Sequence, residues 1–333
     1  MAAGHELSTG EFKRGNRSDD ELWSAISNAL SDQVSHDTSY KFAFLKSIID
    51  NLYNADENLV LSFDKLFSTF TELYWNLVLK YNLYQKVPTK TGKISAVEKL
   101  LKEAKADFLL PDGIPYESLS TEQMIKINHK VKIKCKQNVV GALFADTKEL
   151  FYSFSRSGEW IQINPVMYEF VCKHKLIIEK LNYYQWAKFM EKVNERDAVS
   201  HLLSKIDESS KRNNLAAYRK ILFDEFENKC FYCGKKVSNE KVDVDHFIPW
   251  SYIKNDNLWN FVLACPSCNR SKSDKLASEK YLDILVERNR KIIVSNNYGM
   301  SNYNGQKLRA LYYWAKINGL DADWSPKNKE IIG

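Results

Sequence analysis

The sequence predicts an α+β protein in which a mainly helical N-terminal region with a small β element precedes a C-terminal domain of two short strands and a helix with a structural metal. Three observations support this prediction. Apolar residues recur at helical spacing over much of residues 18–208, one short stretch alternates like a hairpin, and two CxxC pairs follow near residues 230 and 265. Aromatic residues make up 13% of the chain while glycine (12) and proline (7) are scarce, which favours a helix-rich protein with a sizeable core.

The composition excludes two classes of protein. Hydrophobic residues make up 44% and charged residues 27% of the 333 residues, a balance that excludes global disorder. No apolar run approaches the roughly 18–20 residues that span a bilayer, and the first twenty residues carry charges where a signal peptide needs an apolar stretch. We therefore expect a cytoplasmic protein without a membrane partner. The net charge of +6 is compatible with a nucleic-acid partner without requiring one.

Helices are expected over most of the chain. Residues 1–17 are polar and contain glycine, which predicts a flexible tail. Ser18 is a suitable N-cap because the acidic residues Asp19, Asp20 and Glu21 follow it. Further helices are expected over 38–53, 63–81, 95–106, 165–194, 209–227, 278–290 and 304–318, with a loop over 107–120 where two prolines and a glycine lie.

Two stretches of the N-terminal region have the period of strands. Lysines alternate with apolar residues over Lys130–Lys136, and Leu150–Asn164 resembles a hairpin with its turn at Ser155–Gly158. The lysines between 126 and 136 have two interpretations, a surface that follows phosphates or one solvated face of a strand. The polar stretch Asp207–Asn213 marks the boundary between a recognition or partner domain over 18–208 and a second domain over 209–333.

The cysteines of the second domain predict a structural zinc site. Cys230 and Cys233 form one CxxC pair, and Cys265 and Cys268 form another. Four thiolates at about 2.3 Å complete a tetrahedral zinc site, which leaves no open position for chemistry. In a chain without an export signal, paired CxxC units indicate a metal site rather than disulfides.

The residues between the two pairs have the order strand, strand, helix. Val242, Val244 and His246 alternate up to a sharp turn at Pro249, a second short strand is expected near Phe261–Ala264, and a helix begins at the second pair. This order, over a finger of residues 230–275, resembles the ββα-metal motif of HNH nucleases. Its first histidine is His246.

The stretch DVDHFIPWSYIKNDNLWNFVLACPSCNRSKSD is similar, without a gap, to the HNH domain of the RNA-guided CRISPR nuclease. The shared residues are Asp243, Val244, Asp245, His246, Pro249, Ser251, Lys254, Asp256, Asn260, Val262, Leu263, Asn269, Arg270, Lys272, Ser273 and Asp274. Outside the finger, TSYKFAFLKSIIDNL, the pair Tyr74–Trp75 and LWNFV resemble bacterial restriction and defence HNH proteins.

Phosphodiester hydrolysis needs an activated water and neutralisation of the charge on the phosphate. A histidine with a pKa near 6.5 takes a proton at neutral pH, so His246 is the expected general base, although a buried structural histidine is the alternative. Mg²⁺ and Mn²⁺ prefer oxygen ligands, and the resemblance implies Asp245 and the side-chain oxygen of Asn269 as those ligands. Asn269 also suits a helix N-cap, and the two roles are compatible.

The remaining residues of the motif are expected to support this chemistry. The resemblance implies that Asn260 belongs to the catalytic set by holding the loop or orienting His246. Arg270 and Lys272, at the start of the helix, are expected DNA contacts through the phosphate backbone. Asp243 either belongs to the site or completes a strand end.

The function that these features predict is a metal-dependent DNA endonuclease of bacterial antiviral defence. A nucleic-acid-binding zinc module without catalysis and a structure-specific or RNA-directed nuclease stay open as alternatives. The N-terminal domain is expected to bind a DNA feature, a second copy of the chain or a partner defence protein.

Overall fold

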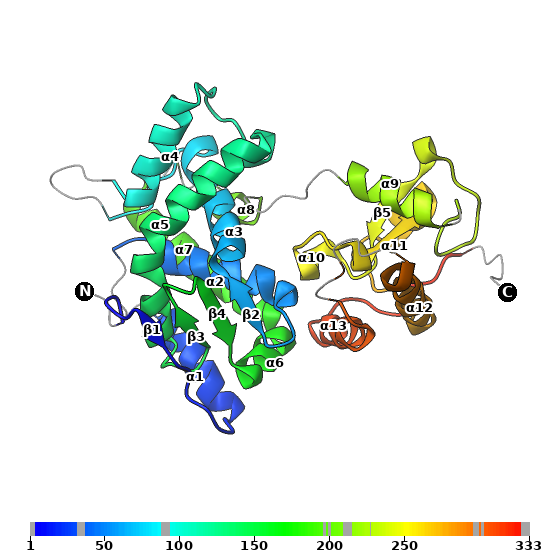
Figure 1. Cartoon of the computed structure of the whole chain (residues 1–333), viewed down its shortest axis with the longest axis horizontal. Coiled ribbons are helices and arrows are strands. Elements are labelled where there is room, and N and C mark those ends of the chain that lie inside the picture. The colour runs from blue at the N-terminus through cyan, green and yellow to red at the C-terminus, as the bar shows by residue number, and fades with distance from the viewer. Residues whose placement is uncertain are drawn as a thin grey trace. The chain divides into compact units, whose positions relative to one another are not determined.

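The computed structural model describes residues 4–31, 37–87, 94–195, 198, 201–208, 215–226, 228–295, 300 and 303–327. The chain divides into two compact units, Met1–Lys211 and Arg212–Gly333. This division falls within the polar stretch Asp207–Asn213, where the sequence changes character. Each unit is described by itself below, and Figure 1 shows the elements of both.

The first unit is mainly helical. Its helices are α1 (Asp19–Ala29), α2 (Tyr40–Asn51), α3 (Phe63–Trp75), α4 (Ala96–Asp107), α5 (Thr121–Asp146), α6 (Pro165–Lys173), α7 (Lys175–Val193) and α8 (Leu202–Glu208). Ser18 and Ser95 cap α1 and α4 in capping boxes, because the glutamate three residues later bonds back to each serine's backbone. Helices α2, α3, α5 and α7 pack together around buried aromatic side chains that include Phe67, Trp75 and Trp186.

The predicted strand over Lys130–Lys136 is wrong, because these residues lie in the middle of α5. Ile127, Val131 and Cys135 recur every four residues and are fully buried, whereas Ile133, the middle one of the three apolar residues in the strand pattern, is 47% exposed. The apolar residues of this stretch thus fit both the strand period of two residues and the helical period of 3.6 residues, and the stretch forms a helix. A third capping box begins the helix at Ser120.

A four-stranded antiparallel sheet completes the first unit. Its strands β1 (Thr9–Gly10), β2 (Val60–Ser62), β3 (Tyr152–Ser155) and β4 (Trp160–Ile163) lie in the order β1-β3-β4-β2. The predicted hairpin is confirmed as β3 and β4. The predicted flexible tail is wrong for its central part, because Thr9 and Gly10 pair with Ser155 and Phe154.

Backbone packing explains why this N-terminal segment is held. Gly4 approaches α5 so closely that a Cβ added to it would lie 2.2 Å from the carbonyl oxygen of Gly141. Arg156 also donates from its guanidinium to the carbonyl of His5 at 2.7 Å. Glycine at both contact positions therefore permits an approach that any side chain would block.

The second unit is built on a two-stranded antiparallel sheet. Its elements are α9 (Ala216–Glu225), β5 (Asp243–His246), α10 (Trp250–Ile253), β6 (Phe261–Ala264), α11 (Pro266–Lys272), α12 (Glu279–Ser295) and α13 (Gly305–Ile317). β5 and β6 pair from Asp243–Ala264 to His246–Phe261, and both α9 and α11 pack against them. The predicted helix over 209–227 is observed as α9; residues 209–214 and 227 lie outside the described residues.

Among the described residues, no helix has both the length and the apolar character needed to cross a membrane.

Candidate functional site

The four cysteines of the second unit converge on one point. Their Sγ atoms all lie within 4.8 Å of one another, and Sγ of Cys233 is 3.9 Å from Sγ of Cys265. The first pair lies in a turn before β5, where Gly234 (φ +74°) donates its N–H to the carbonyl of Cys230. The second pair begins α11, with Cys265 as its N-cap. The two pairs are thus presented by a turn and a helix start.

This cluster fits a zinc ion. Tetrahedral Zn–S bonds of about 2.3 Å place the sulfurs about 3.8 Å apart, close to the 3.9 Å between Cys233 and Cys265. Burial raises the pKa of Cys230 to about 11, and burial together with Cys230 raises the pKa of Cys268. Cys230 and Cys268 are therefore helped to become thiolates by a bound cation, and four soft sulfur ligands suit zinc.

α11 approaches β5 so that two polar pairs form between them. Asn269 donates from Nδ2 to Oδ2 of Asp243 at 3.0 Å, and Lys272 lies 3.0 Å from Oδ2 of Asp245. Residues two apart on a strand lie on one face, as do residues three apart on a helix, so the two pairs lie side by side. Asp243 therefore fixes the amide of Asn269, and the side-chain oxygen of Asn269 is the atom left to accept.

The second pair is buried, which contradicts one prediction. Lys272 is 0% exposed, and its ammonium donates to Oδ1 of Asp245 and to the carbonyl of His246 at 2.8 Å, with Oδ2 of Asp245 3.0 Å away in an ion pair. The hydroxyl of Tyr232 donates to the same carboxylate at 2.5 Å. Lys272 is therefore not a phosphate contact, because the packing of α11 on β5 turns its charge inward to balance Asp245.

His246 lies at the end of β5 with its ring between aromatic side chains. The ring centroid is 4.7 Å from that of Phe261 and 5.5 Å from that of Trp250. Nε2 of His246 lies 2.9 Å from Oδ1 of Asp256, and both side chains are less than a tenth exposed. The ring position is therefore set by packing on its faces and by a carboxylate at one nitrogen.

Asn260 holds the turn that follows His246. Its side chain is fully buried, and its amide accepts from the N–H and donates to the carbonyl of Ile248, each at 2.9 Å. Its own carbonyl accepts from the N–H of Phe247 at 2.8 Å. Both ends of the side chain bond to the backbone of Ile248, and the predicted part of Asn260 in the catalytic set stays a prediction. The loop-holding role describes its position.

The oxygens of Asp245 and Asn269 are of the kind that a hard divalent cation prefers. A carboxylate offers about four lone-pair sites, of which Tyr232 and Lys272 use part at Asp245, and Asn269 contributes an amide oxygen. Lys272 adds a positive charge beside the same carboxylate. A cation held by one or two protein ligands of this kind would complete its coordination with phosphate oxygens. Arg270 is exposed on α11, with its Nε donating to the carbonyl of Pro266 at 3.2 Å, and its role as a DNA contact stays a prediction.

Two residues of this site were missed by sequence reasoning. Tyr232 lies inside the first CxxC pair, where its hydroxyl reaches Asp245 across the fold, and a tyrosine between cysteines carries no pattern that indicates this. Asp256 appeared only as one of the residues shared with the HNH domain of the CRISPR nuclease. Its spacing of ten residues from His246 gives no geometric indication of their contact.

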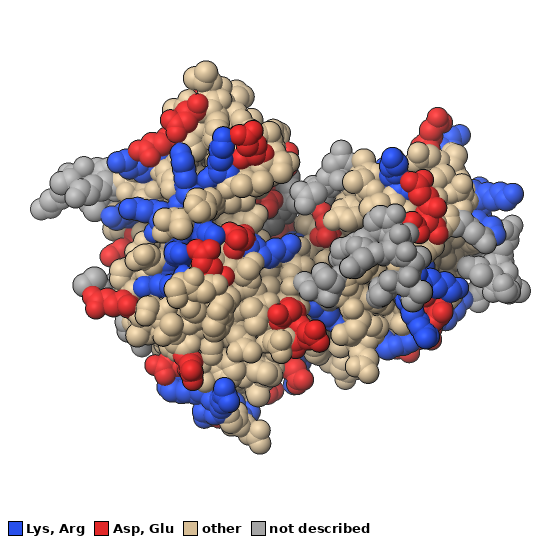
Figure 2. Space-filling model, in the orientation of Figure 1, with Lys and Arg blue, Asp and Glu red and all other residues tan. Residues whose placement is uncertain are grey.

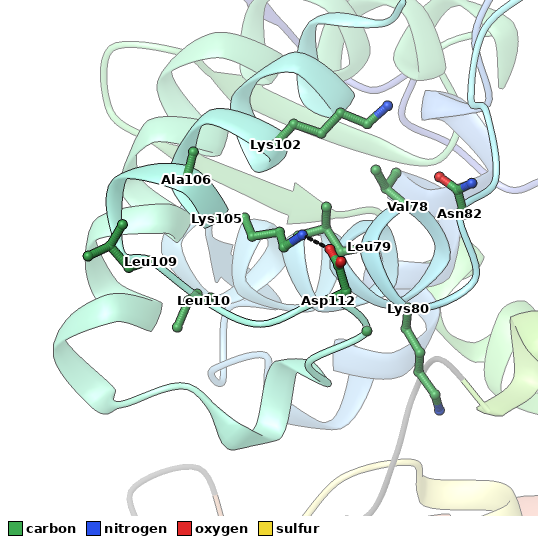
Figure 3. A pocket seen from close by; sticks show the side chains of 11 residues that line it. Val78, Leu79, Lys80, Asn82, Lys102, Lys105, Ala106, Leu109, Leu110 and Asp112 are labelled. Carbon is green, nitrogen blue, oxygen red and sulfur yellow. Dashed lines mark hydrogen bonds and ion pairs between the residues drawn. The ribbon is translucent and has the colours of Figure 1, made fainter.

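The first unit carries a hollow of about 800 Å³ between the π-helical turn Asn76–Lys80, α4 and residues 109–113. Figure 3 shows Lys102 extending toward the side of Val78 and Asn82, while Lys80 points away. Lys105 pairs with Asp112. Among the described residues, the lining contains no histidine, cysteine or hydroxyl side chain.

Four of the five lysines of α5 have acidic partners among the described residues, Lys134 being the exception. Lys132 and Lys136 turn toward Glu159, at 2.6 Å each, and Lys126 pairs with Glu122 at 2.6 Å. On the face shown in Figure 2, basic and acidic side chains intermingle over α4 and α5. This arrangement agrees better with a solvated, self-neutralised helix than with a surface that follows phosphates.

Comparison with known families gives a match within the second unit. The family profile described as HNH endonuclease matches residues 230–278, which include the four cysteines, β5, β6 and α11. These residues form a domain of the HNH endonuclease family.

One relative extends this likeness. The "SPbeta prophage-derived putative HNH endonuclease YoqL" of Bacillus subtilis (strain 168) is 27% identical over 119 residues. The match covers 31% of this chain and 44% of that protein, so the chain spans less than half the length of the relative. No solved structure gives a significant match to the chain.

Proposed function

We propose that this protein is a metal-dependent endonuclease that hydrolyses phosphodiester bonds of DNA in bacterial defence. The observation that carries the proposal is that His246 ends β5 within the matched HNH domain, directly after Asp245, while Asn269 lies on α11, which packs against this strand. A binding-only zinc module has no need of this combination. The zinc cluster then serves as the frame on which β5 and α11 meet.

In this proposal His246 is the general base. It accepts a proton from the water that attacks phosphorus, and Asn260 keeps its loop in place by holding the backbone of Ile248. When bound by Asp245 and Asn269, Mg²⁺ or Mn²⁺ would neutralise charge on the scissile phosphate and on the departing 3′-oxygen. Arg270 would contact a neighbouring phosphate and so position the strand.

The experiment that tests this proposal is a cleavage assay on duplex DNA, single-stranded DNA and RNA, each with Mg²⁺, Mn²⁺ or EDTA. We expect metal-dependent cleavage of DNA that His246→Ala lowers by roughly 10²–10⁴. His129→Ala, which alters an exposed histidine of α5, is the matched control and should leave the rate unchanged. DNA binding without cleavage under every condition would favour the zinc module, and preferential cleavage of RNA or of branched DNA would favour the other alternative.

We further propose that the first unit provides recognition of DNA, of a partner defence protein or of a second copy of the chain. The support is the lysine-lined hollow, in which Asp112 is the single carboxylate beside Lys80, Lys102 and Lys105. Lys102→Glu should weaken binding of an anionic partner, whereas Lys99→Glu, on the same helix outside the hollow, is the control. Equal effects of the two variants on DNA affinity would contradict a role for the hollow.

A further inference from the structure

The carboxylate of Asp256 is buried beside His246 without a full set of partners. The side chains of Asp256 and His246 are 6% and 7% exposed, and Oδ1 lies 2.9 Å from Nε2 of the imidazole. Oδ2 is buried and has no hydrogen-bond partner among the described residues. Among the described residues, the one hydrogen bond of this carboxylate is therefore with the histidine, while the hydroxyl of Tyr218 donates to the backbone carbonyl of Asp256 at 3.4 Å.

Such an arrangement is poorly explained by stability alone. A buried carboxylate is costly unless donors or a cation surround it, and buried polar atoms are normally satisfied. A loop-stabilising aspartate would bond to nearby backbone N–H groups, as Asp56 does to Asn58 and Val60 in the first unit. The carboxylate of Asp256 instead makes its one described hydrogen bond to a side chain of the proposed catalytic centre.

We propose that Asp256 is the positioning residue of the general base, an inference that rests on the proposed function. The carboxylate of Asp256 accepts a hydrogen bond from the N–H at Nε2 of His246. The neutral imidazole therefore carries its hydrogen on Nε2 and leaves Nδ1 as the basic nitrogen. The ring is also held by Phe261 and Trp250, and Lys272 fixes the backbone carbonyl of His246 at 2.8 Å. Ring and tautomer are thus fixed before substrate arrives.

The proton inventory of the step follows from this geometry. A water O–H bond breaks as its oxygen forms a bond to phosphorus, and the proton passes to Nδ1 of His246. The P–O3′ bond then breaks, and the electron pair stays on the departing oxygen, which takes a proton from solvent or from the imidazolium. The negative charge of Asp256 faces the imidazolium at Nε2 during this interval, so the carboxylate stabilises the charge that develops on the ring.

Asp256→Asn tests the positioning role, with Asp321→Asn, an exposed carboxylate of the same unit, as control. An amide can turn its N–H toward Nε2 and so move the hydrogen to Nδ1. Loss of a supporting residue of this kind typically lowers activity by about 10–100-fold. We expect that loss in kcat, with KM within about 3-fold and a melting temperature no lower than that of the unaltered protein, since an unsatisfied buried charge is removed.

A double-mutant cycle separates positioning from general damage. Asp256→Ala should lower kcat in the unaltered protein, but it should cause no further loss in a His246→Ala background, since the histidine through which it acts is gone. Equal losses in both backgrounds would overturn the proposal. So would retention of full kcat by Asp256→Asn, or a loss of activity that parallels a loss of zinc.

Nitrogen NMR of the imidazole gives a readout that needs no activity. The experiment uses the zinc-loaded full chain labelled with ¹⁵N-histidine, and the signals of His246 are assigned by their disappearance in His246→Ala. These signals should show a protonated Nε2 and an unprotonated Nδ1. In Asp256→Asn this pattern should reverse or become mixed. A hydrogen on Nδ1 of the unaltered protein would refute positioning even if DNA is cleaved. The expected pattern in a protein that cuts nothing would instead refute the proposed function and leave the positioning geometry standing.

Discussion

The buried pair of Lys272 and Asp245 allows a prediction whose magnitude follows from the structure. Lys272→Ala removes an ammonium that is 0% exposed and donates to the carboxylate of Asp245 and to the carbonyl of His246. The carboxylate then stays buried without its cation, and breaking a buried pair in this way costs about 3–5 kcal/mol. With a urea m-value of about 2 kcal/mol/M, the unfolding midpoint of the second unit should fall by roughly 1.5–2.5 M.

The assay is urea unfolding of the zinc-loaded full chain, followed by tryptophan fluorescence. Lys275→Ala is the control, because that side chain is 47% exposed and lies 4.0 Å from its partner Asp321. A substitution of such an exposed residue changes the free energy of unfolding by no more than about 0.5 kcal/mol. The two lysines are three residues apart in sequence, so the comparison isolates burial.

The opposite outcome has a clear signature. If Lys272 lay at the surface and contacted phosphate, its removal would change the free energy of unfolding by no more than about 0.5 kcal/mol and would lower the salt slope of DNA binding by about 0.9. That combination would refute the inward orientation of the lysine. Replacing the pair together, by Lys272→Met with Asp245→Leu, should restore much of the lost stability, since apolar replacements of buried pairs are often neutral or stabilising.

Three further predictions concern zinc, pH and strand number. Elemental analysis should find about one zinc ion per chain. Cys233→Ser should lose this zinc and unfold the second unit, because structural zinc supplies on the order of 10 kcal/mol of folding free energy. A zinc-free protein that stays folded would contradict this prediction. Burial of His174 against Trp23 and Phe170 lowers the pKa of its imidazole, so the unfolded chain binds the proton more readily than the folded chain. The free energy of unfolding of the first unit should therefore fall as the pH drops below about 6.5. In urea titrations at pH 5–8, His174→Gln should flatten this dependence. Because one finger offers one general base, supercoiled plasmid should yield nicked circles before linear product, with the linear form rising with enzyme concentration; linearisation in one step by a protein that sediments as a monomer would refute this.

The elements that the sequence predicted well have local causes. Ser18 and Ser95 begin helices because a glutamate three residues later completes a capping box, and both can be recognised without tertiary information. The strand over Phe261–Ala264 was placed by its position before a CxxC pair, and its four residues are buried. The error in α5 arose because a window of seven residues fits both periods, and only the longer series from Ile127 separates them.

The site was predictable in its residues but not in its contacts. The spacing of the four cysteines predicts their convergence because two turns can present two sulfurs each, and the structure brings them together. The direction of Lys272 depends on how α11 packs on β5, which no linear pattern records. The same applies to Asp256, whose contact with His246 depends on the path of the loop after α10.

The short strand β1 has a practical consequence for work with this protein. β1 covers the outer side of β3, with Thr9 and Gly10 opposite Ser155 and Phe154. A shortened chain that starts at Ser18, the first helix cap, would lose this cover and leave a row of unpaired N–H and C=O groups along β3. Such bare edges recruit strands from other molecules, so self-association on storage, rather than loss of cleavage, would be the first symptom of the truncation.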